Sequence, residues 1–143
     1  MWRSHMQSIQ VKAFKNELRN YNYYLQRETS LVNSVEFLYD RLGGVRGVDP
    51  SKEPIHAMPN KEMEWKLRDD ISKLEAKLSL LRAKIAYIDQ ILNRMEKEQR
   101  QAVKAVFCDS HRMEDECKKY HYSPQGFNHY INKAIEGALD EKI

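Results

Sequence analysis

The chain has 143 residues, of which 31% are charged, with five glycines, four prolines and a formal net charge of +3. This length fits one ordinary domain or two small ones, and the composition is typical of a helical protein with long exposed faces. Two cysteines are too few for a disulfide scaffold and fit a reducing cytoplasm, and no stretch approaches the roughly 20 apolar residues of a membrane span. The charge permits nucleic-acid binding without indicating it.

The N-terminal third predicts one long helix. Residues 1–5 resemble a cloning remnant, so we expect the natural chain to start at Met6. From Met6 to Leu42 the apolar spacing predicts a helix packed on more than one neighbour, with Glu28 interrupting the register. Glycine often ends a helix by adopting a left-handed conformation, so Gly43-Gly44 predicts the end of this one.

Residues 43–60 predict a loop. Three of the four prolines lie in it: Pro50, Pro54 and Pro59. The loop is long for a compact protein, which suggests a mobile or functional segment. Asn60 is the predicted N-cap of the helix that follows.

A second long helix is predicted from about Lys61 into the 90s, with a bend or break near Asn93. Its apolar residues alternate at intervals of four and three without a break: Leu67, Ile71, Leu74, Leu78, Leu81, Ile85, Ile88, Leu92 and Met95. Such a seam packs along its length against another helix. An antiparallel hairpin within residues 6–94 and parallel pairing between two chains both bury it. We expect a homo-oligomer that forms through this helical region.

Residues 95–143 predict a small helix-turn-helix domain, so the expected fold is all-α throughout. A short amphipathic helix ends at Cys108–His111, and a second runs from Met113 to Tyr120. Cys117 supplies the small residue needed where two helices cross, whereas His121 stands where glycine is usual. Ser123 is the predicted N-cap of the last helix, and Pro124 suits its first position.

The last helix is a candidate DNA reader. Phe127 and Ile131 would hold it to the body while polar residues project outward. Glutamine and asparagine can bond adenine edges in pairs, and lysine suits phosphate. The candidate DNA-binding residues are Ser123, Gln125, Asn128, His129, Asn132 and Lys133. Residues 96–143 carry eight Lys and Arg against nine Asp and Glu, a net of −1, whereas DNA readers are usually basic. A plain three-helix cap with a polar face is the alternative.

These segments resemble sigma factor region 4. Met95-Glu-Lys-Glu-Gln-Arg-Gln-Ala-Val resembles the opening "L-P-E-R-E-R-x-V-I", and Met113-Glu-Asp-Glu-Cys-Lys-Lys-Tyr-His-Tyr-Ser resembles "L-E-E-I-A-x-x-L-G-I-S". Lys133-Ala-Ile resembles the closing "K-A-L". With the preceding helices, most of the chain is similar to phage late transcription regulators of the RinA/ArpU type.

This resemblance implies a regulator that switches on phage late genes in the cytoplasm of a bacterial host. Its partners would be promoter DNA and host RNA polymerase. The family's DNA-contact positions correspond to Pro124, Gln125, Asn128 and His129, and none of these is the arginine that the family places there. Glu116 stands where the family has an apolar residue. A coiled-coil interaction adaptor without DNA binding is the alternative function.

Other chemistries are less well supported by the sequence. Cys108, His111, Cys117 and His121 are zinc-type ligands, but their spacing fits no standard finger. No glycine-rich phosphate loop or nucleophile cradle is present, so we expect neither an enzyme nor a cofactor or metal. Tyrosines and phenylalanines between residues 21 and 39 could stack on single strands, although packing of an amphipathic helix explains them better.

Overall fold

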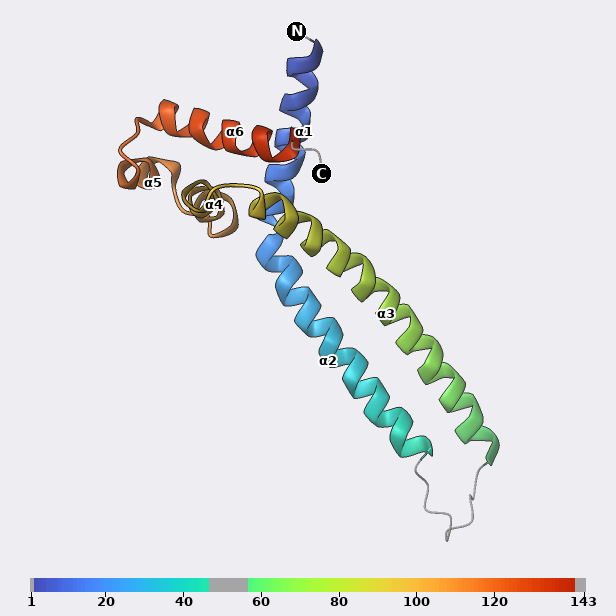
Figure 1. The fold of residues 1–143 in the computed structure, drawn as a ribbon. Coiled ribbons are helices and arrows are strands. Elements are labelled where there is room, and N and C mark those ends of the chain that lie inside the picture. The colour runs from blue at the N-terminus through green and yellow to red at the C-terminus, as the bar shows by residue number, and fades with distance from the viewer. Residues whose placement is uncertain (1, 47–56, 141–143) are drawn as a thin grey trace. The chain divides into compact units, whose positions relative to one another are not determined.

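The computed structural model describes the backbone of residues 2–46 and 57–140 and the side chains of 9–44 and 61–140. Within these residues the chain is all-α, as the sequence predicts, and forms six α-helices and one π-helical segment (Figure 1). The three N-terminal helices are α1 (Trp2–Arg19), α2 (Tyr21–Arg46) and α3 (Ala57–Asn93). None of the described helices combines the length and apolar character that crossing a bilayer demands.

Helices α2 and α3 form a long antiparallel hairpin (Figure 1). Arg82 Nε lies 3.1 Å from Glu28 Oε2, and the Tyr39 hydroxyl donates to Glu75 Oε1 at 3.1 Å. Later positions on α2 therefore meet earlier positions on α3. A small apolar cluster lies further along the hairpin: Leu42, Leu67 and Ile71, with Leu38 packed against it. The hairpin within one chain is thus confirmed. Glu28, which interrupts the apolar register of α2, forms an ion pair with Arg82 of α3.

The apolar seam of α3 is largely buried, as its spacing predicts. The helix ends at Asn93 as expected, so the last of the nine predicted positions, Met95, lies just beyond it. Of the nine, only Leu74 and Leu81 are partly exposed. The predicted start was wrong, because α3 begins at Ala57 and Asn60 lies inside it rather than at its N-cap. Pro59 falls in the first turn of α3, where a missing N–H removes no intrahelical hydrogen bond.

The N-terminal helix differs from its prediction in three places. It starts at Trp2 rather than Met6, and it is interrupted at Asn20, whose amide side chain donates to the Asn16 carbonyl at 3.0 Å. That side chain competes with the backbone for the same acceptor. Helix α2 passes through Gly43-Gly44 to Arg46, because neither glycine adopts a positive φ. The predicted loop 43–60 is therefore shorter, and its residues 47–56 lie outside the described residues.

The described residues fall into two compact units. The hairpin unit comprises residues 25–83, and the base unit comprises the residues before and after it. The base unit has the better-filled core, which takes large side chains from α1, α3, α6 and the first C-terminal helix: Leu18, Ile88, Val103, Phe127, Ile131 and Ile135.

The C-terminal segment follows the predicted order of short helices. It consists of α4 (Lys97–Val103), the π-helical segment η1 (Lys104–Cys108), α5 (Met113–Lys119) and α6 (Pro124–Asp140). The predicted breaks at Cys108–His111 and after Tyr120 are confirmed, whereas the widening of the first short helix into η1 was not predicted. Helix α6 packs against α1, α4 and α5, and Arg94 Nη1 donates to the Ala138 carbonyl near its end at 2.9 Å.

Candidate nucleic-acid interface

A tight turn joins α5 to α6. His121 adopts a φ of +63°, and the next amide, that of Tyr122, donates to the Cys117 carbonyl at 3.0 Å. A left-handed conformation is costly for any residue with a Cβ, which is why glycine is usual at such positions. Cys117 itself is buried, and its Sγ donates to the Glu114 carbonyl at 3.2 Å. The predicted small residue and tight turn are both present.

Ser123 caps helix α6, as predicted. Its Oγ accepts the Gly126 amide hydrogen bond at 3.0 Å, and Pro124 occupies the first helical position. A Cβ at Gly126 would lie 3.1 Å from Ser123 Oγ, so only glycine leaves the cap unperturbed. Sequence reasoning does not single out Gly126, because the position three residues after a capping serine more often takes glutamate or glutamine. The Ser123 hydroxyl is thus already engaged in shaping the helix.

The inner face of α6 is fixed by packing. Its buried residues are Phe127, Ile131, Ala134, Ile135 and Ala138. Aromatic rings surround Phe127 at its N-terminal half: the Tyr120 ring stacks 5.5 Å away, and the Tyr122 and Tyr130 rings lie 5.0 Å apart. Since aromatic pairs add stability beyond their buried area, the start of α6 is held firmly against α5 and the turn.

The outer face of α6 presents three of the predicted residues to solvent. Gln125, Asn128 and His129 are all exposed, and none of their side chains makes a hydrogen bond within the described residues. Two amides and an imidazole therefore stand free on one surface of a helix whose other side is immobilised. That arrangement offers both donors and acceptors to an incoming partner.

The other two predicted contacts, Asn132 and Lys133, are less free. Asn132 is half-buried, and its Oδ1 is inaccessible to solvent yet has no hydrogen-bond partner within the described residues. The Lys133 ammonium lies 3.5 Å from Glu136 Oε2 one turn along. Both atoms are on exposed or half-buried side chains, so this ion pair holds the lysine only weakly.

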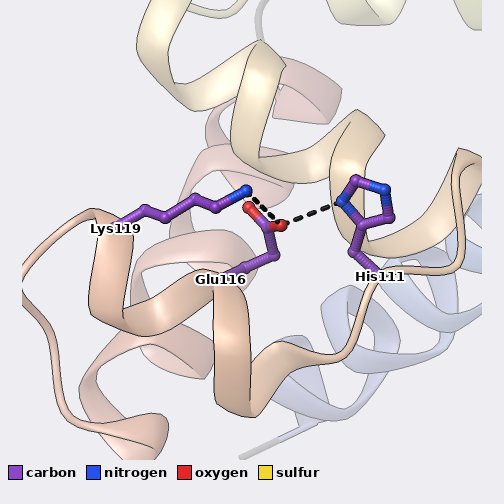
Figure 2. A network of polar contacts seen from close by, with 3 residues as sticks. All are labelled: His111, Glu116 and Lys119. Carbon is purple, nitrogen blue, oxygen red and sulfur yellow. Dashed lines mark hydrogen bonds and ion pairs between the residues drawn. The ribbon is translucent and has the colours of Figure 1, made fainter.

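A buried carboxylate lies in α5. Glu116 is 4% exposed, and its Oε1 lies 2.9 Å from His111 Nδ1 and 3.1 Å from Lys119 Nζ. Figure 2 shows the Lys119 and His111 side chains reaching the carboxylate from opposite sides. Burial favours a higher pKa for Glu116, but hydrogen bonds from Lys119 and His111 and their charges outweigh it, so the pKa lies below its usual value. The resemblance described above predicts an apolar residue at this position, but the charge of Glu116 is compensated locally by His111 and Lys119. Neither partner is predicted from the sequence.

The predicted zinc-type ligands do not gather. No three His, Cys, Asp or Glu side chains in the part of the chain that the structure describes are grouped to hold a metal ion. Burial raises the pKa of the Cys108 thiol to about 11, with the Asp109 charge adding to the effect. The Cys108 thiol is therefore less acidic than an ordinary cysteine.

The aromatic residues of α2 do not form one continuous stripe. Tyr24 is buried, the Tyr21 hydroxyl donates to Asp89 Oδ1 at 2.6 Å, and the Tyr39 hydroxyl bonds to Glu75. Tyr23 and Phe37 are exposed, at positions of different units. The packing interpretation of these residues therefore explains more of them than stacking on single strands does.

Comparisons of this chain with protein-family models, with curated proteins and with solved structures find no match.

Proposed function

We propose that this protein is a phage-type transcription regulator that binds promoter DNA, host RNA polymerase or both to control late genes. The observation that carries the proposal is the two-sided character of α6. Its inner face is anchored by buried apolar residues, and its outer face exposes Gln125, Asn128 and His129. A rigid helix with free amides on its outer face suits the major groove of DNA.

Each outer residue has a distinct role in this proposal. The amides of Gln125 and Asn128 pair with the edge of adenine, and His129 donates to or accepts from a base or phosphate. Lys133 exchanges its exposed contact with Glu136 for a phosphate oxygen. Asn132 supports the reading surface with the part of its side chain that remains exposed.

The net charge of the C-terminal segment favours binding to DNA and RNA polymerase together over binding to DNA alone. Residues 96–143 have a net charge of −1, so α4 to α6 alone offer little attraction to DNA. Binding is then weak in isolation and stronger where RNA polymerase is also present on the promoter. Help from RNA polymerase would explain why a segment with a slightly negative net charge carries a polar face suited to DNA.

A gel-shift and transcription series with a late-promoter fragment tests the proposal. The triple variant Gln125→Ala/Asn128→Ala/His129→Ala is expected to lose about 1–3 kcal/mol of binding free energy per disrupted base contact on the promoter and little on random DNA. A matched variant removes exposed polar groups from α2 and α3 instead: Gln26→Ala, Ser72→Ala and Gln90→Ala. If the α6 variant binds and activates like the parent, the helix is not a reader.

A coiled-coil adaptor without DNA binding is the second candidate function. It is favoured by the same net charge and by an apolar groove on the hairpin unit, formed by Phe37, Leu38 and Leu74. A pull-down from host lysate with and without nuclease separates the two. Polymerase recovered in both places the protein on the enzyme, and recovery of neither DNA nor polymerase favours the adaptor.

The groove also supports self-association of the hairpin. Two helices cover only one face of each other, and the hairpin unit leaves large apolar side chains in solvent: Phe37, Tyr39, Met63, Trp65 and Leu80. Surfaces of this kind on a helical hairpin are commonly covered by a second copy, which would make a helical bundle. We propose a homodimer formed through this unit.

A further inference from the structure

Three cations share one face of α1. Lys12, Lys15 and Arg19 follow one another at intervals of three and four residues, which brings them to the same side of a helix. The acid of α1 among the described side chains, Glu17, is engaged elsewhere, because its Oε2 accepts the Tyr24 hydroxyl at 2.9 Å. The cationic face is therefore not neutralised by its own helix.

The cluster is held against the base unit by one aromatic ring. Lys15 Nζ lies 5.5 Å and Arg19 Cζ 5.4 Å from the centre of the Phe107 ring on η1. Cations at this distance from an aromatic face are attracted to it, and their alkyl stems cover it. Lys104 on η1 and Asp109 directly after it carry opposite charges, so η1 and its end add no net charge beside the three cations of α1.

Among the described residues the three cations have no anionic partners. No carboxylate among the described residues lies within ion-pairing distance of Lys12, Lys15 or Arg19, and the Arg19 guanidinium donates instead to the neutral Asn16 Oδ1 at 2.9 Å. Burial, and then the charges of Arg19 and Lys12, hold the pKa of Lys15 below its usual value. An incoming anion would relieve this repulsion.

The spacing of the cluster selects a polyanion over a small anion. At about 1.5 Å per residue, Lys12 and Arg19 are separated by about 10 Å along the helix axis. One inorganic phosphate cannot reach both ends, whereas duplex DNA presents a negative charge about every 1.7 Å of its axis. A nucleic-acid backbone can therefore meet all three side chains at once.

We infer that Lys12, Lys15 and Arg19 of α1 form the phosphate-binding surface of the base unit and contact the backbone of duplex DNA. The inference rests on the proposed function for its choice of DNA among polyanions. It supplies, from a helix outside the C-terminal segment, the positive charge that residues 96–143 lack. In this arrangement α1 would provide affinity for DNA of any sequence, and α6 would provide sequence specificity.

The test measures binding of the full chain to a short random-sequence duplex over a series of salt concentrations. Each phosphate contact contributes about 0.9 to the slope of log K against log salt. The variant Lys12→Gln/Lys15→Gln/Arg19→Gln is expected to flatten that slope by about 2 to 3 and to weaken binding about tenfold or more near 0.1 M salt. Inorganic phosphate should not compete with the duplex for the parent protein.

Two controls separate this effect from charge and folding. Arg27→Gln/Lys66→Gln/Lys77→Gln removes the same charge from exposed positions of the hairpin unit and should leave the slope unchanged. The charge-preserving Lys12→Arg/Lys15→Arg/Arg19→Lys should retain it. Lys15 and Arg19 contact the Phe107 ring, whereas Lys12 is not among its cation contacts. If the triple glutamine variant fails to fold, the single variant Lys12→Gln should still flatten the salt slope by about 1.

The outcomes distinguish this inference from the proposed function. An unchanged slope in the folded α1 variant, or a flattening equal to that of the hairpin control, overturns the phosphate surface even if α6 still reads the promoter. Loss of promoter preference in the α6 variant with a normal salt slope supports both. A parent protein that binds no duplex at low salt overturns the phosphate surface and the DNA half of the proposed function together.

Discussion

The Nδ1 atom of His111 lies 2.9 Å from Oε1 of Glu116, a carboxylate that is 4% exposed. His111 precedes α5 in the loop that follows η1, and Glu116 lies in the first turn of the helix (Figure 2). Together with Lys119 the contact turns a buried charge into a bridge between a loop and a helix. A buried charge is tolerated only when it is paired and hydrogen-bonded in this way.

This bridge predicts a specific loss of stability in acid. The pKa of Glu116 lies below its ordinary value of 4.5, so its ionised form is favoured by folding. The resulting stability is fully present above the unfolded-state pKa and is lost as the pH falls through the lower, folded-state pKa. When urea unfolding is measured from neutral pH to below pH 4.5, the free energy of unfolding of the parent should therefore fall. The fall should be smaller in Glu116→Leu.

The same variant tests whether the bridge is needed for stability. Replacing a buried ion pair by an apolar residue of similar volume is often neutral or stabilising by about 1–4 kcal/mol, so Glu116→Leu should not destabilise the chain at neutral pH. Lys119→Ala removes one partner and should cost about 1–3 kcal/mol. Glu114→Leu, at an exposed position of α5, is the control and should keep the acid dependence of the parent. Equal acid loss in the parent and Glu116→Leu would contradict the bridge.

The turn before α6 predicts a stabilising substitution. His121 has a φ of +63°, where a residue with a Cβ loses about 1–2 kcal/mol, and glycine avoids this at an entropic cost of about 0.5–1 kcal/mol. His121→Gly should therefore raise the free energy of unfolding by up to about 1 kcal/mol, and His121→Val should lower it. Lys118→Gly, inside α5, is the contrasting case and should be destabilising by about 1 kcal/mol. Thermal and urea unfolding of the three variants decide the matter.

The hairpin seam predicts opposite responses at two nearby leucines. Leu78 is 8% exposed and Leu80 is 71% exposed, two positions apart on α3. Leu78→Asp places an unpaired charge in the seam and should reduce both helicity and melting temperature. Leu80→Asp adds the same charge in solvent and should leave the fold intact. Similar circular dichroism and melting for both variants would mean that the seam is not buried.

The hairpin also predicts the state of association. If a second copy covers the exposed groove, sedimentation at micromolar concentration should give twice the 17.0 kDa mass of one chain. Phe37→Ser, at a 60% exposed position lining the groove, should shift this equilibrium toward the monomer without lowering helicity. A monomer at all concentrations in the parent would rule out the homodimer.

The sequence predicts local features of this fold better than contacts between distant segments. The α3 seam and the Ser123 cap follow from the spacing of nearby residues, and the structure has both. The interruption at Asn20 depends on one amide competing for one carbonyl, and no periodicity carries that signal. The passage of α2 through Gly43-Gly44 shows that glycine permits a helix end without requiring it.

The candidate site shows the same division. The outward face of Gln125, Asn128 and His129 follows from the apolar positions of α6, and the structure exposes all three. The contact of Lys15 and Arg19 with Phe107 joins residues far apart in the sequence, so the cationic face of α1 had no signal in the sequence beyond a helical spacing. The enclosed oxygen of Asn132 is likewise a product of tertiary packing.

That oxygen predicts a separation of stability from binding at Asn132. Its Oδ1 is inaccessible to solvent and has no partner within the described residues, so it carries a desolvation cost of about 1–3 kcal/mol with no hydrogen bond in return. Asn132→Ala should therefore leave the free energy of unfolding unchanged or raise it. If Asn132 supports the reading surface, the same variant should weaken promoter binding while random-sequence binding stays constant. Gln125→Ala, at an exposed position, is the comparison and should leave stability unchanged. A destabilised Asn132→Ala would show that the oxygen has a hydrogen-bond partner in solution, such as a bound water, and that its role is structural.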